Sequence, residues 1–180
     1  AHLHERSRDP EVRLLRARLG LASGLETEPT AELRALLAEL PSDQGHARAR
    51  VRRQLAAALI AQRKPDEARA ELDALLAEQP SDIEGSLALA ELGLARGRYS
   101  EAVQVISALT ENHGQLARAY AILGRAELGV GQLDAAEAAF RRLWELAPHE
   151  PDARYWLGVT LWRRGQVDQA KRLIDGNVKR

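Results

Sequence analysis

The stretch ARAYAILGRAELGVGQLDAAEAAFRRLWELAPHE, residues 117–150, decides the fold of this chain. Laid against the rest of the sequence at a spacing of 34 residues, it meets the same residue types in the same places. Five columns recur: Gly124 with Gly158 and Ala90; Gly131 with Gly165 and Gly97; Ala136 with Ala170, Ala102 and Ala68; Phe140 with Ile174, Ile106 and Leu72; and Pro148 with Gly114 and Pro80. A fixed period of this size indicates tandem structural repeats.

Each column has a physical reason. The small residue of the first column lies mid-helix, where glycine costs about 1 kcal/mol against alanine and is tolerated when a partner helix approaches closely. The glycine of the second column can end that helix with a positive φ. Short polar residues near the start of the next helix can cap it: Asp66, Ser100, Asp134 and Asp168. Proline then closes the unit. The period therefore predicts two helices per repeat.

Composition agrees with an all-α fold. Of the 180 residues 45% are hydrophobic, most of them Ala and Leu, with a single Phe. Ala and Leu are strong helix formers because they lose little side-chain freedom in a helix. We expect helices near residues 11–23, 29–39, 47–62, 66–78, 83–96, 100–112, 116–129, 134–146, 151–164 and 167–175.

The pattern resembles the tetratricopeptide repeat, a two-helix unit of about 34 residues. Six of the family's eight signature places are filled in residues 117–150, by Tyr120, Leu123, Gly124, Ala136, Phe140 and Pro148. Glu127 and Leu143 depart from the other two places, where the family prefers an aromatic and a small residue. Arg63 stands where the turn glycine is expected. The resemblance implies a right-handed superhelical stack of about five antiparallel helix pairs.

We expect a single solenoid over residues 1–180, with repeats at about 11–43 (irregular), 49–82, 83–116, 117–150 and 151–180. In the first repeat, Leu19-Gly20 is aligned with Leu157-Gly158 through their distances from Pro10 and Pro148. Residues 1–10 are interpreted as the tail of an upstream repeat. Helix 11–23 is apolar on two sides and helix 167–175 on one, so we expect an array that lacks its first neighbour and finishes near Arg180.

No enzyme chemistry is apparent in the sequence. Cysteine is absent, and His2, His4, His46, His113 and His149 are scattered over the terminus and separate turns. A metal site needs ligands that converge on one point, and no phosphate-binding loop or nucleophile elbow occurs. We therefore expect no catalytic residue, no metal and no cofactor.

Charge and hydropathy restrict the classes of partner that the sequence is suited to bind. The formal net charge is zero, which gives no general attraction to nucleic acid. The run HARARVRR at 46–53 is interpreted as surface helix charge, because its arginines fall on two faces of a helix. No apolar run is long enough to span a membrane. Residues 151–180 carry a net +4 and residues 83–150 a net −3, which leaves open an acidic partner segment or self-association of unlike ends.

In the family, a stripe of each first helix lines a concave groove that binds protein segments. The resemblance places a partner-binding set on that stripe: Arg53, Leu87, Glu91, Leu94, Arg118, Arg125, Leu128, Tyr155 and Trp162. Leu94, Leu128, Tyr155 and Trp162 are the expected apolar anchors, and Arg118 and Arg125 the charged flank. Trp144 is expected in the core, while Trp156 is left open between core and surface.

The sequence thus predicts a non-catalytic module that binds a protein or peptide. Its alternative is an architectural spacer in a larger envelope or assembly protein, whose groove is filled by its own chain. Arginine far outnumbers lysine, which is typical of GC-rich bacteria, but the sequence does not choose between cytoplasm and periplasm.

Overall fold

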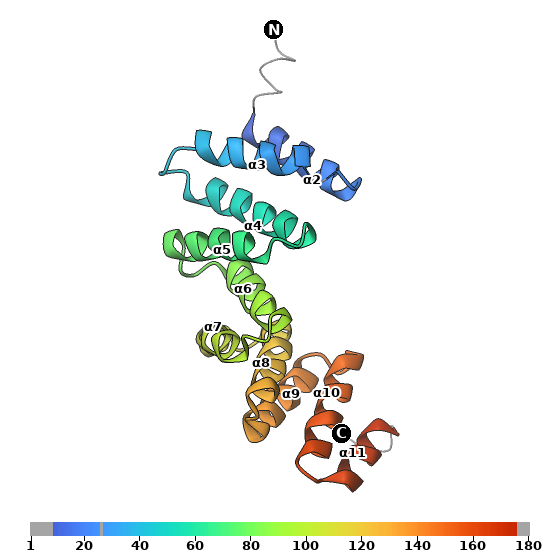
Figure 1. Cartoon of the computed structure of the whole chain (residues 1–180). Helices are drawn as coiled ribbons and strands as arrows, with labels where there is room; N and C mark the ends of the chain where they lie inside the picture. The colour runs from blue at the N-terminus through green and yellow to red at the C-terminus, as the bar shows by residue number, and fades with distance from the viewer. Residues whose placement is uncertain (1–8, 26, 176–180) are drawn as a thin grey trace. The chain divides into compact units, whose positions relative to one another are not determined.

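The computed structural model describes residues 9–25 and 27–175, and this part of the chain consists of helices without a strand (Figure 1). The helices are α2 (Pro10–Ala22), α3 (Thr27–Glu39), α4 (Gly45–Ala61), α5 (Pro65–Glu78), α6 (Ile83–Ala95), α7 (Tyr99–Asn112), α8 (Ala117–Val130), α9 (Leu133–Leu146), α10 (Pro151–Arg163) and α11 (Val167–Ile174). The predicted all-α class is confirmed, and each predicted helix is present with ends that differ by one or two residues.

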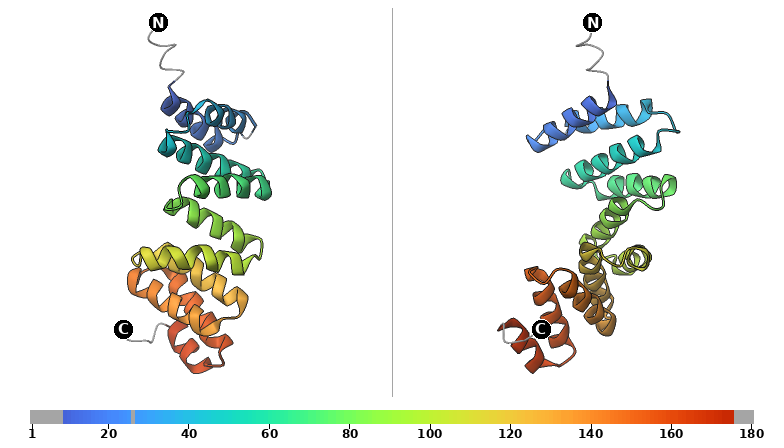
Figure 2. Two further views of the ribbon diagram at one scale, coloured as in Figure 1. Left: turned by 90° about the vertical axis from the view of Figure 1, so that its left-hand side faces the viewer. Right: turned by 180° about the vertical axis from the view of Figure 1, so that it is seen from behind.

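The chain divides into two compact units, Ala1–Gly85 and Ser86–Arg180. In the first, α2 packs on α3, α3 on α4 and α4 on α5. In the second, α7 packs on α8, α8 on α9, α9 on α10 and α10 on α11, and α10 also reaches α8 (Figure 2). Each unit is thus built from antiparallel helix pairs. The predicted repeat boundaries and single solenoid domain stay predictions.

The repeat register is visible in the backbone. The mid-helix small residues Ala17, Ala56, Ala90, Gly124 and Gly158 are all buried. Seven residues after each of them the chain adopts a positive φ, between 58° and 83°, at Gly24, Arg63, Gly97, Gly131 and Gly165. This left-handed residue ends the first helix of the pair, as predicted for Gly97, Gly131 and Gly165.

The predicted alignment of the first repeat is wrong. Leu19 is 60% exposed, whereas Leu157 is 1% exposed, so the two do not share a place. Ala17 takes the place of Gly158, and Leu33 follows it by the same number of residues that separates Phe140 from Gly124. The match of Leu19-Gly20 to Leu157-Gly158 failed because residue type alone does not say which side of α2 faces α3.

Ala17 and Ala56 are 39 residues apart, five more than the repeat period of 34, and a longer α4 accounts for most of the difference. This helix has 17 residues, while α2, α6 and α10 have 13 and α8 has 14. α4 begins eleven residues before Ala56, and α6 begins seven before Ala90. About one extra helical turn therefore extends the N-terminus of α4.

The predicted helix caps are also wrong. The N-cap places of α5, α7, α9 and α11 are Lys64, Arg98, Gln132 and Gln166, and none makes a side-chain capping hydrogen bond. Asp66, Ser100, Asp134 and Asp168 lie one residue inside their helices. The three aspartates there still oppose the positive end of the helix dipole, which is a weaker contribution than a cap.

Replacing Arg63 by glycine is expected to stabilise the protein by about 1 kcal/mol. Arg63 is the one non-glycine residue with positive φ in the described chain, at 58°, and an L side chain is strained there. Part of the gain is offset because glycine has more freedom in the unfolded chain. Chemical denaturation would measure it. Arg63→Ala is the control, since alanine keeps the strain, and equal stability of both variants would contradict the prediction.

The core of the second unit lies between α8, α9, α10 and α11. Its buried members are Leu128, Ala136, Phe140, Leu143, Ala153, Leu157, Leu161, Ala170 and Leu173. Trp144 and Trp156 are partly buried against this cluster, so Trp144 packs as predicted. Phe140 fills the space beside Gly124, where a Cβ would lie 2.7 Å from its ring. Packing on this shared core therefore determines which side chains of α8 and α10 are exposed.

Candidate binding surface

The predicted partner-binding residues lie on the first helices of four pairs. Arg53 lies on α4 in the first unit. The others lie in the second unit: Leu87, Glu91 and Leu94 on α6, Arg118, Arg125 and Leu128 on α8, and Tyr155 and Trp162 on α10. Eight of the nine predicted residues therefore lie within the second unit.

Two predicted contacts are not available to a partner. Leu87 is 2% exposed and Leu128 is 6% exposed. Leu128 belongs to the core cluster with Leu157 and Leu161 of α10, because α10 packs over the end of α8. Their selection as partner-binding residues is therefore corrected, while Leu94 is half-buried.

Arg118 of α8 and Glu91 of α6 form a two-pronged ion pair. The Nε and Nη2 atoms of Arg118 donate to the two carboxylate oxygens of Glu91 at 3.0 and 2.9 Å. Both side chains are about half exposed. An exposed pair of this kind contributes little stability, so a partner carboxylate can compete for Arg118 at low cost.

Arg125, Trp156 and Tyr155 form a cationic and aromatic cluster. The guanidinium carbon of Arg125 lies 5.6 Å from the centre of the Trp156 ring. Trp156 also stacks on Phe140, with ring centres 6.2 Å apart. Tyr155 meets Trp156 edge to face at 5.1 Å and is 57% exposed. Within the described residues no carboxylate forms an ion pair with Arg125.

We call Arg118, Arg125, Tyr155 and Trp156 the α8–α10 surface. The sequence did not decide whether Trp156 lies in the core or on the surface. The sequence feature that marks Trp156 is its position directly after Tyr155. The stacked Trp156 holds Arg125 above the core, and the exposed ring of Tyr155 extends the apolar area. Arginine and aromatic side chains of this kind dominate binding energy when a partner desolvates them.

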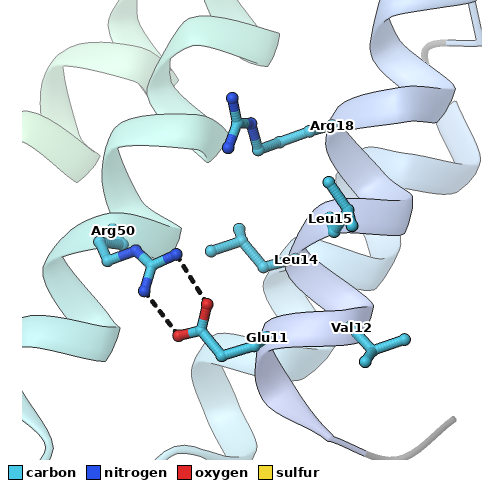
Figure 3. A pocket seen from close by; sticks show the side chains of 6 residues that line it. All are labelled: Glu11, Val12, Leu14, Leu15, Arg18 and Arg50. Carbon is cyan, nitrogen blue, oxygen red and sulfur yellow. Dashed lines mark hydrogen bonds and ion pairs between the residues drawn. The ribbon is translucent and has the colours of Figure 1, made fainter. Parts of the chain in front are cut away.

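In the first unit the arginines of α4 are engaged within the chain. Arg53 pairs with Asp82 at 3.1 Å, and Arg50 makes a two-pronged ion pair with Glu11 of α2 at 2.6 and 2.7 Å (Figure 3). The latter pair borders a cavity of about 270 Å³, which is lined by Glu11, Val12, Leu14, Leu15, Arg18 and Arg50. Arg53, which is predicted to contact a partner, is therefore already paired with Asp82 within the chain.

The other arginines of this run are paired as well. Arg48 and Arg52 both bind Glu78 of α5, at 3.1 and 2.8 Å. Their hydrogen bonds lower the pKa of Glu78 to about 2. Arg48 also donates to the carbonyl oxygens of Leu37 and Leu40. The run therefore ties α4 to its neighbours, which favours the interpretation as surface helix charge.

Across residues 9–25 and 27–175, no three His, Asp or Glu side chains converge in a way that could hold a metal ion. His46, His113 and His149 are exposed, and His2 and His4 lie outside the described residues. In the same ranges no helix combines the length and apolar character needed to cross a bilayer.

The comparisons with known proteins agree with the register. The sequence profile of the tetratricopeptide repeat matches residues 59–126 and 127–176, together more than half of the chain. The chain belongs to the tetratricopeptide repeat family. None of the curated proteins matches it.

Solved structures with the same fold are distant in sequence. MamA from Desulfovibrio magneticus RS-1, from position 41 to its end, superposes with a TM-score of 0.84 at 20% identity over 94% of this chain and 93% of that one. A tetratricopeptide repeat protein from Parabacteroides merdae gives a TM-score of 0.84 at 17% identity, over 93% of this chain and 65% of that one. At such identities the likeness shows the fold alone.

Membership of the family is consistent with a role in protein–protein interaction. Tetratricopeptide repeats form a non-catalytic fold of protein–protein interaction, built so that stacked helix pairs present a continuous surface. The chain has this fold.

Proposed function

We propose that this tetratricopeptide repeat protein is an adaptor that binds an acidic, partly apolar protein segment across the α8–α10 surface. The observation that carries the proposal is Arg125, held over Trp156 at 5.6 Å beside the exposed ring of Tyr155. An exposed cation without a carboxylate partner, bordered by an exposed aromatic ring, is suited to a segment with an acidic and an apolar side chain close together.

Electrostatics supports an acidic segment. Residues 151–175 carry five basic and three acidic side chains, a net +2. Arg118 already binds a carboxylate of the chain, that of Glu91. The same guanidinium geometry suits a partner carboxylate that replaces Glu91. Charge-assisted, two-pronged arginine–carboxylate bonds are among the stronger contacts available to such a partner.

One observation supports the alternative function, that of an architectural spacer. Two of the residues expected to favour binding, Leu87 and Leu128, are buried by the chain itself. A spacer would use the groove residues for internal packing in this way. The exposed members of the α8–α10 surface would then carry no partner.

We expect Arg125→Glu and Tyr155→Ala each to weaken partner capture by about 30-fold, which corresponds to about 2 kcal/mol. Both side chains are exposed, so neither change is expected to alter the melting temperature by more than a few degrees. The measurement is capture from a lysate of the source cell, quantified by mass spectrometry, followed by titration of the captured protein.

The matched control is Arg172→Glu on α11, which reverses a charge outside the α8–α10 surface and should leave capture unchanged. If both folded surface variants capture the same proteins as the wild type with the same affinity, the α8–α10 surface is not the binding site.

A further inference from the structure

One repeat packs on the next through a defined pair of faces in the second unit. Trp156 of α10 stacks on Phe140 of α9, and α10 covers Leu128 of α8. Leu133, at the start of α9, packs against the same cluster. We call Leu128, Leu133 and Phe140 the rear face of this repeat, since the following helix pair lies on it.

The same three places are exposed on the last described helix pair. Moving 34 residues along the chain from the rear face gives Trp162, Val167 and Ile174. Their exposed fractions are 63%, 41% and 60%, whereas Leu128 and Phe140 are 6% and 0% exposed. Within the described residues no helix follows α11, so nothing equivalent to α10 lies on these three side chains. They form an open rear face.

The complementary face is exposed on α2. Ala17 of α2 and Gly158 of α10 share a place in the repeat, so Val12, Leu15 and Leu19 correspond to Ala153, Trp156 and Thr160. On α10 these residues are buried or partly buried and include the Trp156 that stacks on Phe140. On α2 the three are 36%, 53% and 60% exposed. They form an open front face.

We propose that a second copy of this chain covers these faces, with α2 of one copy packed on α10 and α11 of the next. The occupant is inferred from register, because the chain carries both halves of the interface that α10 makes with α8 and α9. Scattered exposed apolar residues are ordinary on a protein surface, but three in the register of a packed interface at each end are not.

The two ends of the described chain differ in net charge. Residues 9–43, which contain α2 and α3, have seven acidic and four basic side chains, a net −3. Residues 151–175, which contain α10 and α11, have a net +2. Over the whole ends these opposite net charges favour the encounter of unlike ends, while α2 by itself carries Glu11 against Arg13, Arg16 and Arg18, a net +2. A contact between unlike ends is heterologous, so it continues into a ring or an open filament.

The test is the mass of the purified chain in solution between about 10 µM and about 1 mM, because a contact through so few side chains is expected to be weak. Sedimentation equilibrium should show a mass that rises with concentration beyond that of a dimer. The front variant, Leu15→Glu with Leu19→Glu, and the rear variant, Trp162→Glu with Val167→Glu, should each remain monomeric.

The decisive sample is an equimolar mixture of the two variants. Each retains one intact face, so the mixture should form a dimer of one front and one rear variant that grows no further. Arg125→Glu is the control from the α8–α10 surface and should associate like the wild type. This separates the proposal from the proposed function, since the front variant should still capture the adaptor's partner, whereas Arg125→Glu should lose that capture and still associate.

Three outcomes overturn the proposal. If the wild-type chain stays monomeric at about 1 mM, a second copy does not cover the two faces, and other repeats or other proteins would be their partners. A rear variant that dimerises alone indicates contact between two α2 helices. If the charged variants do not fold, as circular dichroism would show, Leu19→Ser and Val167→Ser take their place. Unchanged association of those folded variants contradicts the proposed contact.

Discussion

Replacing Gly124 by leucine is expected to lower the free energy of unfolding by about 3 kcal/mol, since overpacking a tight core costs about 1–3 kcal/mol and sometimes more. A Cβ at Gly124 would lie 2.7 Å from two ring carbons of Phe140 and 2.9 Å from a third. Phe140 is fully buried, so its ring cannot move aside without disturbing the core. Chemical denaturation followed by circular dichroism measures the change.

Gly158 provides the matched control, because it occupies the same place one repeat later. A Cβ there would meet the Cγ1 of Ile174 at 3.1 Å, and Ile174 is largely exposed and can move. Gly158→Leu should therefore cost about 1 kcal/mol or less. Equal costs at the two glycines, or a Gly124→Leu variant that melts with the wild type, would show that burial of the neighbour does not decide the effect.

Replacing Glu127 by glutamine is expected to raise the free energy of unfolding by about 2 kcal/mol near pH 8 and to change it little near pH 5. Glu127 is 8% exposed, and its Oε2 atom has no hydrogen-bond partner. Burial raises the pKa of its carboxyl group to about 7. The folded protein therefore holds a proton that the unfolded chain releases.

The sign of the pH dependence follows from this. Between pH 4.5, the ordinary pKa of a glutamate, and pH 7 the folded state binds more protons than the unfolded state, so stability falls as the pH rises through that window. Glutamine removes the charge and with it this dependence. Denaturation of wild type and variant at several pH values measures the difference.

Glu137 is the control of opposite sign. It is buried to a similar degree, and burial alone would raise its pKa, but hydrogen bonds from Arg141 and Arg164 outweigh burial and lower it. Glu137→Gln should therefore destabilise the protein near neutral pH, because it weakens the hold on both arginines. If Glu127→Gln and Glu137→Gln change stability in the same direction near pH 8, pairing is not what distinguishes the two carboxylates.

Local signals made the fold predictable from sequence. The small residue, the left-handed residue seven places later and the apolar place near the middle of the second helix recur at 34 residues, and each acts within one helix pair. Helix ends from α4 to α11 could therefore be placed within one or two residues. Gly131 is required by its own backbone, which has a positive φ of 83°, and Gly124 leaves room for the Phe140 ring of the next helix.

What depends on packing between helices could not be predicted in the same way. Leu128 and Trp162 hold the same place in successive repeats, yet one is buried and the other is exposed. The sequence around each is similar, and the difference is whether a further helix pair lies on it. The same reason explains the wrong alignment of Leu19, since an apolar stripe on α2 does not state which neighbour covers it.

The sequence by itself thus determined the helix pairs, their order and the family, because these follow from periodicity along the chain. Only the tertiary structure decided which groove residues are exposed, that Arg53 is held by Asp82, and that Arg125 rests on Trp156. These contacts join residues 29 and 31 positions apart in the sequence. Burial and pairing at that range are set by how helices pack on one another, which no local pattern records.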